Sequence, residues 1–375
     1  MPFDKIILYI MAVGVLLGAL DRIIGNKFGL GEQFEEGFNS MGPLALGMVG
    51  IVCLAPVISD VLGPIIIPIF NLCGADPSMF ATILANDMGG YPLAMELAHN
   101  KEAGMLAGLV VSSMLGCTLV FSIPVGLGLI EYEDRPFFAK GLLIGLITIP
   151  FGGIIGGLIA GFNLSMVIIN MIPVIILAVI LAVILAVGLK FNSTLMINGS
   201  LIFGKFISIL ITIGLGAAAF QEITGIVLIK GMTPIREGIQ VIGSIAIVLL
   251  GTFPILHLLV KVLNKPLTIV GGKLGMDATS AAGLVFTLAN SIPVYKMMKD
   301  MSPKGKVVNT AWLVCATAAL GDHLGFTAGV VPEMITPVVI GKLVGGVLAI
   351  ALAILMTKDL TLEEEQSIKM KKDAV

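Results

Sequence analysis

The feature that most constrains this chain is a series of long apolar runs, most of them close to 20 residues long. A helix of about 20 apolar residues can cross the hydrocarbon core of a bilayer, which is roughly 30 Å thick. Of the 375 residues, 57% are hydrophobic and only 12% are charged, about half the charged share of an average soluble domain. The sequence therefore predicts an all-α polytopic membrane protein. Nine crossings are expected, at residues 5–24, 41–62, 104–130, 138–161, 165–189, 204–228, 239–263, 306–331 and 334–356.

Two more apolar segments, 77–97 and 279–298, are interrupted by polar residues together with proline or glycine. Irregular backbone is tolerated at membrane depth only where protein or water surrounds it. We therefore expect each segment to be broken and re-entrant, which means that it enters and leaves on the same side of the membrane.

Charge and cysteine content exclude several classes of protein. The formal net charge is −2, so there is no basic surface for nucleic acid. The four cysteines are scattered without a C-x-x-C pair, so neither a zinc site nor a disulfide framework is indicated. The chain has no phosphate-binding loop for ATP and no motif of zinc or serine hydrolases. We expect no cofactor and no metal.

The chain repeats itself at an offset that drifts from 200 to 205 residues. Matches in the same order include Lys5, Gly14, Gly50, Asp76, Asn86 and Leu115 with Lys205, Gly214, Gly251, Asp277, Asn290 and Leu320. Internal repeats are typical of transporters. We expect a first transmembrane repeat at 1–162, a connecting transmembrane helix and loop at 163–203, a second repeat at 204–357 and a charged cytoplasmic tail at 358–375.

The distribution of lysines predicts that the two structural repeats are inverted. Lysines gather at 261–273, at 296–306 and at the C-terminus, and such clusters mark the cytoplasmic side. If all three clusters are cytoplasmic, 279–295 cannot cross the membrane. The N-terminus then lies outside and the C-terminus inside. The alternative is eleven full crossings.

Charged side chains inside a bilayer are costly, so each is a candidate functional residue. Asp87 lies in the middle of a broken segment, and Asp322-His323 lies inside the run 306–331. The structural alternatives are a carboxylate that caps broken backbone for Asp87 and a plain aspartate–histidine hydrogen bond for the pair. By repeat position, Asp87 corresponds to Ser291, and Asp322-His323 corresponds to Cys117-Thr118. Each half has therefore kept one acid that the other lacks.

In inverted-repeat transporters the two broken segments meet near the membrane midplane. The predicted substrate-binding cavity is therefore acidic, amide-lined and aromatic. A carboxylate would pair with an ammonium group, a tyrosine ring would add cation–π attraction and the amides would bind a hydroxyl. Its residues are Asn86, Asp87, Tyr91, Asn290, Ser291, Tyr295, Asp322 and His323.

Two other functions stay open. The first is an ion-coupled carrier for another small amine or for a carboxylate. A carboxylate would need a basic group near the midplane, and we expect Lys205 and Lys342 near helix ends. An intramembrane aspartyl protease would need Gly-x-Gly-Asp, but position 319 is alanine, and it would need Tyr-Asp, but Asn86 precedes Asp87.

At these residues the chain resembles the ethanolamine permease family of ethanolamine-utilisation systems, EutH. The resemblance covers about 33 to 346. It is carried by Gln33-Phe34-Glu35-Glu36-Gly37-Phe38, Asn86-Asp87-Met88-Gly89-Gly90, Val120-Phe121-Ser122-Ile123-Pro124-Val125, Asn170-Met171-Ile172-Pro173, Val241-Ile242-Gly243-Ser244-Ile245, Leu288-Ala289-Asn290, Leu320-Gly321-Asp322-His323-Leu324-Gly325-Phe326 and Ile340-Gly341-Lys342-Leu343.

This resemblance implies uptake of ethanolamine, mainly as the protonated amine, across the bacterial cytoplasmic membrane. It implies a membrane permease and not an enzyme, with ethanolamine and the lipid bilayer as partners. Coupling to H⁺ or Na⁺ and assembly into a homo-oligomer are left open, and so is the choice between a uniport channel and alternating access.

Overall fold

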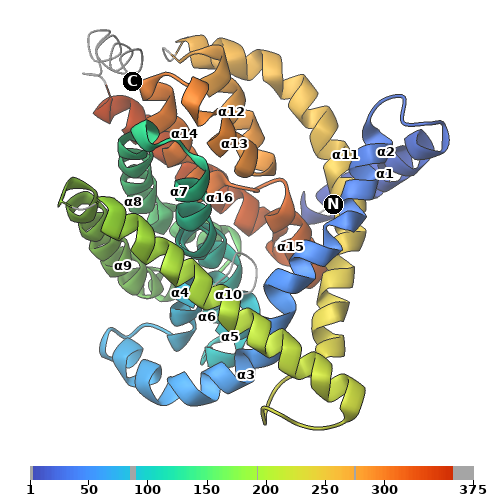
Figure 1. The fold of residues 1–375 in the computed structure, drawn as a ribbon, viewed down its shortest axis with the longest axis vertical. Helices are drawn as coiled ribbons and strands as arrows, with labels where there is room; N and C mark the ends of the chain where they lie inside the picture. Colours follow the sequence, from blue (N-terminus) through green and yellow to red (C-terminus); the bar gives the residue numbers. More distant parts are fainter. Residues whose placement is uncertain (1–2, 85–89, 192, 274–275, 358–375) are drawn as a thin grey trace.

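The computed structural model describes residues 3–84, 90–191, 193–273 and 276–357. Every regular element in this part of the chain is helical (Figure 1). The α-helices of the first half are α1 Phe3–Ile23, α2 Leu30–Asn39, α3 Met41–Leu72, α4 Ala81–Leu84, α5 Gly90–Leu97, α6 Lys101–Met105, α7 Ile123–Leu129 and α8 Arg135–Ile159. Those that follow are α9 Leu164–Phe191, α10 Ser193–Thr224, α11 Ile235–Lys273, α12 Ala278–Ala289, α13 Ile292–Met297, α14 Pro303–Ala316, α15 Asp322–Val330 and α16 Ile335–Met356.

Eight helical stretches in the described residues are long and apolar enough to cross a membrane, so the prediction of an all-α polytopic membrane protein is confirmed. They lie at Asp4–Ile23, Leu30–Leu72, Lys101–Leu129, Tyr132–Ile159, Leu164–Leu181, Leu201–Thr224, Ile235–Val262 and Pro332–Met356. Each corresponds to one of the nine expected crossings. The ninth, 306–331, was wrong as a continuous helix, because α14 ends at Ala316 and α15 begins at Asp322.

Two of the long helices extend beyond the crossings 41–62 and 239–263 that were expected from the sequence. Residues 63–72 continue α3, and residues 265–273 continue α11. Both extensions contain proline, at Pro64 and Pro68 and at Pro266. A proline inside a helix removes one backbone hydrogen bond and kinks the helix. Both helices bend at these ends in Figure 1.

The helix that follows α6 is wound as a π-helix. Two π-helical stretches, η2 Leu106–Gly116 and η3 Thr118–Ser122, lead into α7. Such stretches are rare and are often found at functional sites. Every residue of η2 is buried, so this segment lies at the centre of the molecule. Its repeat counterpart, α14–α15, is unwound in the middle instead.

The helices pack as two bundles that do not follow the sequence halves. The first bundle, defined here as α1, α2, α3, α10 and α11, takes helices from both halves. The second bundle contains α8, α12, α14, α16 and η2, with α4 and α5 packed on η2. Figure 1 shows α1, α2 and α11 on the right of the molecule, with α8, α12, α14 and α16 to their left. Contacts of α11 with α15 and of α3 with α5 join the bundles.

Repeat-related glycines make reciprocal contacts within the first bundle. A Cβ at Gly14 on α1 would lie 2.3 Å from the carbonyl oxygen of Gly251 on α11. A Cβ at Gly214 on α10 would lie 2.4 Å from the carbonyl oxygen of Gly50 on α3. Small residues at membrane helix crossings let the backbones approach closely. The first helix of each half therefore packs on the long helix of the other half.

Candidate functional site

The segment 279–298 is broken where the sequence predicts it. Helix α12 ends at Ala289, Asn290 is extended with φ −163° and ψ 142°, and α13 begins at Ile292. The Oδ1 of Asn290 accepts a hydrogen bond of 2.8 Å from the backbone N–H of Ile292, which caps the first turn of α13. Ser291 is only 2% exposed, and its hydroxyl has no hydrogen-bond partner among the described residues.

The break between α14 and α15 is fastened to the end of α12. The backbone N–H of Ala318 donates to the carbonyl of Thr287, and that of Leu320 donates to the carbonyl of Leu288, both at 2.9 Å. Ala318 adopts a left-handed conformation with φ 52°. These bonds satisfy backbone groups that a continuous helix would have paired within itself, and they explain why the expected crossing 306–331 is interrupted.

Asp322 and His323 form the first turn of α15 directly after this break. Asp322 is half-buried and His323 is 1% exposed. An acidic side chain in the first turn of a helix is stabilised by the positive end of the helix dipole. Gly321 is in backbone contact with the last residue of α12, since a Cβ there would lie 2.2 Å from the carbonyl oxygen of Ala289. Asp322 therefore begins its helix beside the break at Asn290.

The two candidate tyrosines lie in different surroundings. Tyr91 on α5 packs edge-on against Phe326, with ring centroids 6.4 Å apart, and Phe326 is one helical turn after Asp322. Tyr295 is 1% exposed and packs edge-on against Phe138 of α8 at 6.0 Å. Tyr91 thus belongs to the neighbourhood of Asp322, whereas the Tyr295 ring packs against α8.

The contacts thus bring Tyr91, Asn290, Ser291, Asp322 and His323 to one region, where the second-half breaks meet α5. Asn86 and Asp87 lie outside the described residues.

Lys342 lies in a different environment from the one expected from the sequence. Lys342 was expected near a helix end, yet it lies near the middle of the candidate span Pro332–Met356 and is 0% exposed. Its Nζ donates a hydrogen bond of 2.5 Å to the backbone carbonyl of Ser113 in η2. Burying an ammonium group costs free energy unless its protons are hydrogen-bonded. The hydrogen bond to Ser113 also joins α16 to the π-helix η2. The expectation was wrong because the apolar run continues on both sides of the lysine.

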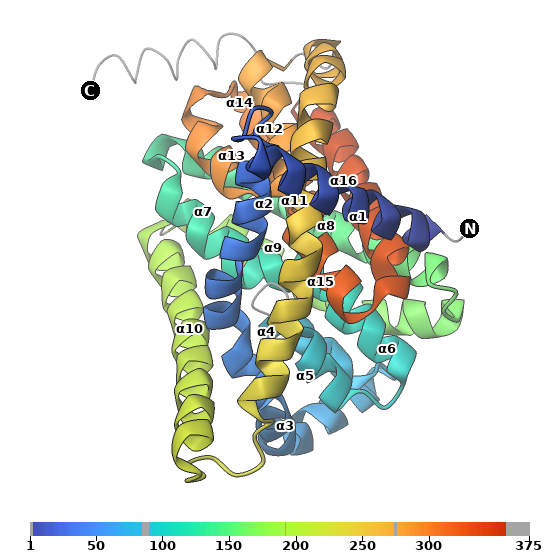
Figure 2. The same cartoon turned by 90° about the vertical axis from the view of Figure 1, so that its right-hand side faces the viewer.

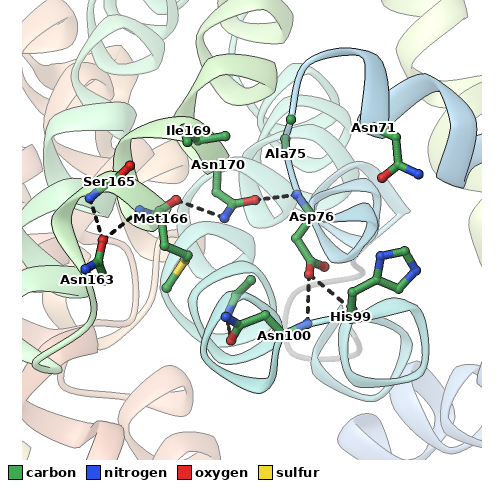
Figure 3. Close-up of a pocket in the computed structure, with 12 residues that line it drawn as sticks. Asn71, Ala75, Asp76, His99, Asn100, Asn163, Ser165, Met166, Ile169 and Asn170 are labelled. Atoms are coloured by element: carbon green, nitrogen blue, oxygen red, sulfur yellow. Dashed lines mark hydrogen bonds between the residues drawn. The ribbon is translucent and has the colours of Figure 1, made fainter.

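A polar cavity of about 460 Å³ lies where the end of α3 meets α9 and α6 (Figure 3). Its side chains include Asn71, Asp76, His99, Asn163 and Asn170. The Asp76 carboxylate is bound by backbone groups: Oδ1 accepts from Ser78, and Oδ2 accepts from His99 and Asn100. This carboxylate therefore fastens the loop before α6 to the loop after α3.

In the second half, the repeat-related aspartate Asp277 also accepts hydrogen bonds from backbone N–H groups. Asp277 accepts hydrogen bonds from the backbone N–H groups of Ser280 and Ser302, at 2.8 Å each, and from the Ser280 hydroxyl. Burial tends to raise the pKa of the Asp277 carboxyl, but these hydrogen bonds outweigh burial and hold its pKa below the ordinary value. Asp76 and Asp277, matched in the sequence, thus make matched contacts.

The model of the family described as "Ethanolamine utilisation protein, EutH" matches residues 3–356. The chain belongs to the EutH family. A relative from Listeria monocytogenes, named "Probable ethanolamine permease EutH", is 53% identical over 95% of both chains. A relative of the same name from Escherichia coli is 48% identical over 95% of this chain and 96% of its own. A Bacillus subtilis relative, "Uncharacterized protein YxeR", is 47% identical over 98% and 99%. No solved structure matches.

Family membership confirms the resemblance proposed from the sequence, and with the candidate spans it establishes a multi-pass membrane protein of the bacterial cell membrane. Sequence reasoning did not foresee the burial of Lys342, and it missed Thr317, a 4% exposed residue directly after α14 whose hydroxyl has no partner among the described residues. The polar pair Asn290-Ser291 and the proline Pro293 that signalled the break in 279–298 have no equivalent beside Thr317, so the sequence offered no signal there.

Proposed function

We propose that this protein is a permease that carries ethanolamine, mainly as its protonated amine, into the cell. The observation that carries the proposal is membership of the EutH family together with relatives 48–53% identical that are named probable ethanolamine permeases. Eight candidate spans and helices broken inside the protein agree with transport.

The proposed substrate-binding cavity contains the eight residues predicted from the sequence. Contacts of neighbouring residues support it, because they bring the segments that carry Tyr91, Asn290, Ser291, Asp322 and His323 together where the second-half breaks meet α5. Asp87 is included in the proposed cavity because its position in the repeat corresponds to that of Ser291. A carboxylate for the ammonium and amide groups for the hydroxyl suit a small amino alcohol.

We further propose nine crossings, two re-entrant segments and inverted repeats, with domain limits at 162, 203 and 357. The buried ion pair between Lys306 and Asp134 supports this topology, because it holds the loop 131–137 and the lysine-rich segment 296–306 at the same end of the molecule. Hydrogen bonds from Thr336 to the Asp4 carboxylate likewise hold the start of α16 beside the start of α1.

The two hairpin connections lie at opposite ends, as inversion requires. In both views the connection between α1 and α2 is in the upper part of the molecule, and the connection between α10 and α11 is at the bottom (Figures 1 and 2). The same arrangement places the α1–α2 connection at the end where α12 and α14 begin.

Transport by alternating access fits the two bundles. Because the broken helices α12 and α14 belong to the second bundle, that bundle can carry the cavity while it moves against the first bundle. A membrane potential of 100 mV supplies about 2.3 kcal/mol per charge, so a uniporter already concentrates the cation. Coupling to H⁺ or Na⁺ would add to this driving force.

Lys342 favours a second candidate function, the transport of a small carboxylate. Its buried ammonium group is the basic group that the sequence analysis required for such a substrate. The bond to the Ser113 carbonyl opposes this alternative, because it already uses one of the three ammonium protons to hold two helices together.

Uptake of radiolabelled ethanolamine into proteoliposomes tests the proposal, with imposed pH, Na⁺ and voltage gradients. Native protein should accumulate the label when the interior is negative, whereas Asp87→Asn and Asp322→Asn should reduce uptake strongly. Uptake of radiolabelled glycolate that excess ethanolamine does not inhibit would support the carboxylate alternative. Uptake no higher than in empty liposomes would refute the permease proposal.

A further inference from the structure

Two half-helices end side by side inside the second half of the chain. Helix α12 ends at Ala289 and α14 ends at Ala316. The hydrogen bonds from Ala318 and Leu320 to the last turn of α12 hold these ends together. The C-terminal end of a helix carries a partial negative charge, and half-helix C-terminal ends coordinate cations in transporters. Two such ends at one point favour a cation there.

Two buried hydroxyls next to these helix ends lack hydrogen-bond partners. Ser291 follows the end of α12 by two residues, and Thr317 is the residue directly after α14. They are 2% and 4% exposed, and neither hydroxyl oxygen has a partner among the described residues. Leaving a buried polar group without a hydrogen-bond partner costs free energy, so two such hydroxyls beside these helix ends point to a ligand that completes them.

A carboxylate lies at the same junction. The backbone of Gly321 touches the Ala289 carbonyl, and Asp322 is the next residue. The positive end of α15 stabilises an acidic side chain in this first turn. The junction therefore offers the carboxylate of Asp322 and two hydroxyl oxygens as hydrogen-bond acceptors.

We propose that Ser291, Thr317 and Asp322 together bind the ammonium group of the substrate and select primary amines. This inference rests on the proposed function and adds Thr317, which no sequence motif indicated. A primary ammonium has three N–H donors, as in the lysine side chain, and one acceptor is present for each. A quaternary ammonium such as choline has no N–H donor and would leave the hydroxyls unsatisfied, so it should bind far more weakly.

The test compares Thr317→Val with Thr317→Ser and with a matched control, Thr310→Val. Valine keeps the shape of threonine and removes only the hydroxyl. Thr310 lies on the same helix and is 0% exposed, but its hydroxyl is already bonded to the Lys306 carbonyl at 2.8 Å. Each variant is purified, checked for a single elution peak and a native-like thermal midpoint, and assayed for ethanolamine uptake in proteoliposomes.

We expect Thr317→Val to raise the half-saturating ethanolamine concentration at least about tenfold. For Thr317→Ser and Thr310→Val, this concentration should stay within about threefold of the native value. Native uptake should be inhibited by ethylamine and hardly at all by choline. Unchanged half-saturation in Thr317→Val, or choline as effective as ethylamine, would overturn the inference. If Thr317→Val does not fold, Ser291→Ala replaces it in the test. This variant should raise the half-saturating ethanolamine concentration at least about tenfold, and an unchanged concentration would overturn the inference.

Failure of the proposed function is distinguishable from failure of this inference. If native protein does not transport ethanolamine, the permease proposal itself is wrong. If native protein does transport it and the hydroxyl variants behave like native protein, only the ammonium site is wrong.

Discussion

The Nε of Arg236, at the start of α11, donates a hydrogen bond of 2.6 Å to the carboxylate of Glu222, near the end of α10. The repeat contains the same pair with the charges exchanged, because Arg22 near the end of α1 donates to Glu35 on α2 at 2.5 Å. Both halves have this ion pair, with the positions of the arginine and the glutamate exchanged. In each half it joins the two helices of a hairpin.

We predict that Arg236→Glu weakens the α10–α11 hairpin and that adding Glu222→Arg restores it. The single change places two carboxylates together, and like charges repel. Because both side chains are solvent-exposed, the effect on the free energy of unfolding should be small, about 0.2–1 kcal/mol. Thermal unfolding at low ionic strength measures it. A double variant no more stable than the single one would contradict the pairing.

The glycine contacts of the first bundle lead to a larger predicted effect. A Cβ at Gly251 would lie 2.0 Å from the carbonyl oxygen of Met11, which is backbone and cannot turn aside. Gly251→Ala should force α1 and α11 apart and lower stability by about 1–3 kcal/mol, as overpacking does in other proteins.

Gly243→Ala is the matched control for this prediction, because it lies on the same helix and a Cβ there meets nothing within 4 Å. It should leave stability unchanged or raise it, since glycine is a poor helix former. Thermal unfolding in detergent separates the two variants. Equal effects of the two changes would show that glycine removal acts through helix propensity and not through the helix crossing.

The hydrogen bonds of Asp277 predict a pH-dependent stability. Its pKa is lowered in the folded protein from the ordinary value of 3.8. Such a group stabilises the fold fully above its unfolded pKa, and the contribution is lost as the pH falls through the lower folded pKa. Asp277→Asn should therefore lower the free energy of unfolding by about 1–3 kcal/mol at pH 7, and the difference from native protein should shrink below about pH 4.

Thermal unfolding of native protein and Asp277→Asn between pH 7 and pH 3 makes this measurement. Asp300→Asn is a suitable control, because Asp300 is an exposed carboxylate in the loop before α14. A difference between native protein and Asp277→Asn that stays constant down to pH 3 would argue against ionised Asp277 as the stabilising form.

The proposed topology predicts opposite accessibility for two exposed lysines. Lys230 lies in the α10–α11 connection and Lys299 lies before α14. Cysteines at these positions should react with an impermeant maleimide only from outside for Lys230→Cys and only after permeabilisation for Lys299→Cys. The background must carry Cys73→Ser, because Cys73 is exposed whereas Cys53, Cys117 and Cys315 are buried. Labelling of Lys299→Cys in intact cells would overturn the re-entrant topology.

The broken segment 279–298 was predictable because its signal is local. Asn290-Ser291 and Pro293 interrupt an apolar run, and a polar pair or a proline disturbs a membrane helix whatever surrounds it. The break at 317–321 was not predictable in the same way. Its residues are mostly small and apolar, and the chain unwinds there because the N–H groups of Ala318 and Leu320 find carbonyl partners on another helix.

The sequence by itself determined that the chain is embedded in a membrane, that it is duplicated and which acids lie in apolar surroundings, because hydropathy and repeat spacing depend on residue type alone. Only the tertiary structure decided which helices share a bundle, that Lys342 is buried against Ser113 and that the break after α14 is bonded to the last turn of α12. The reason is physical: close helix packing and hydrogen bonds between distant segments depend on which backbones meet, and apolar helices resemble one another too closely for the sequence to specify their partners.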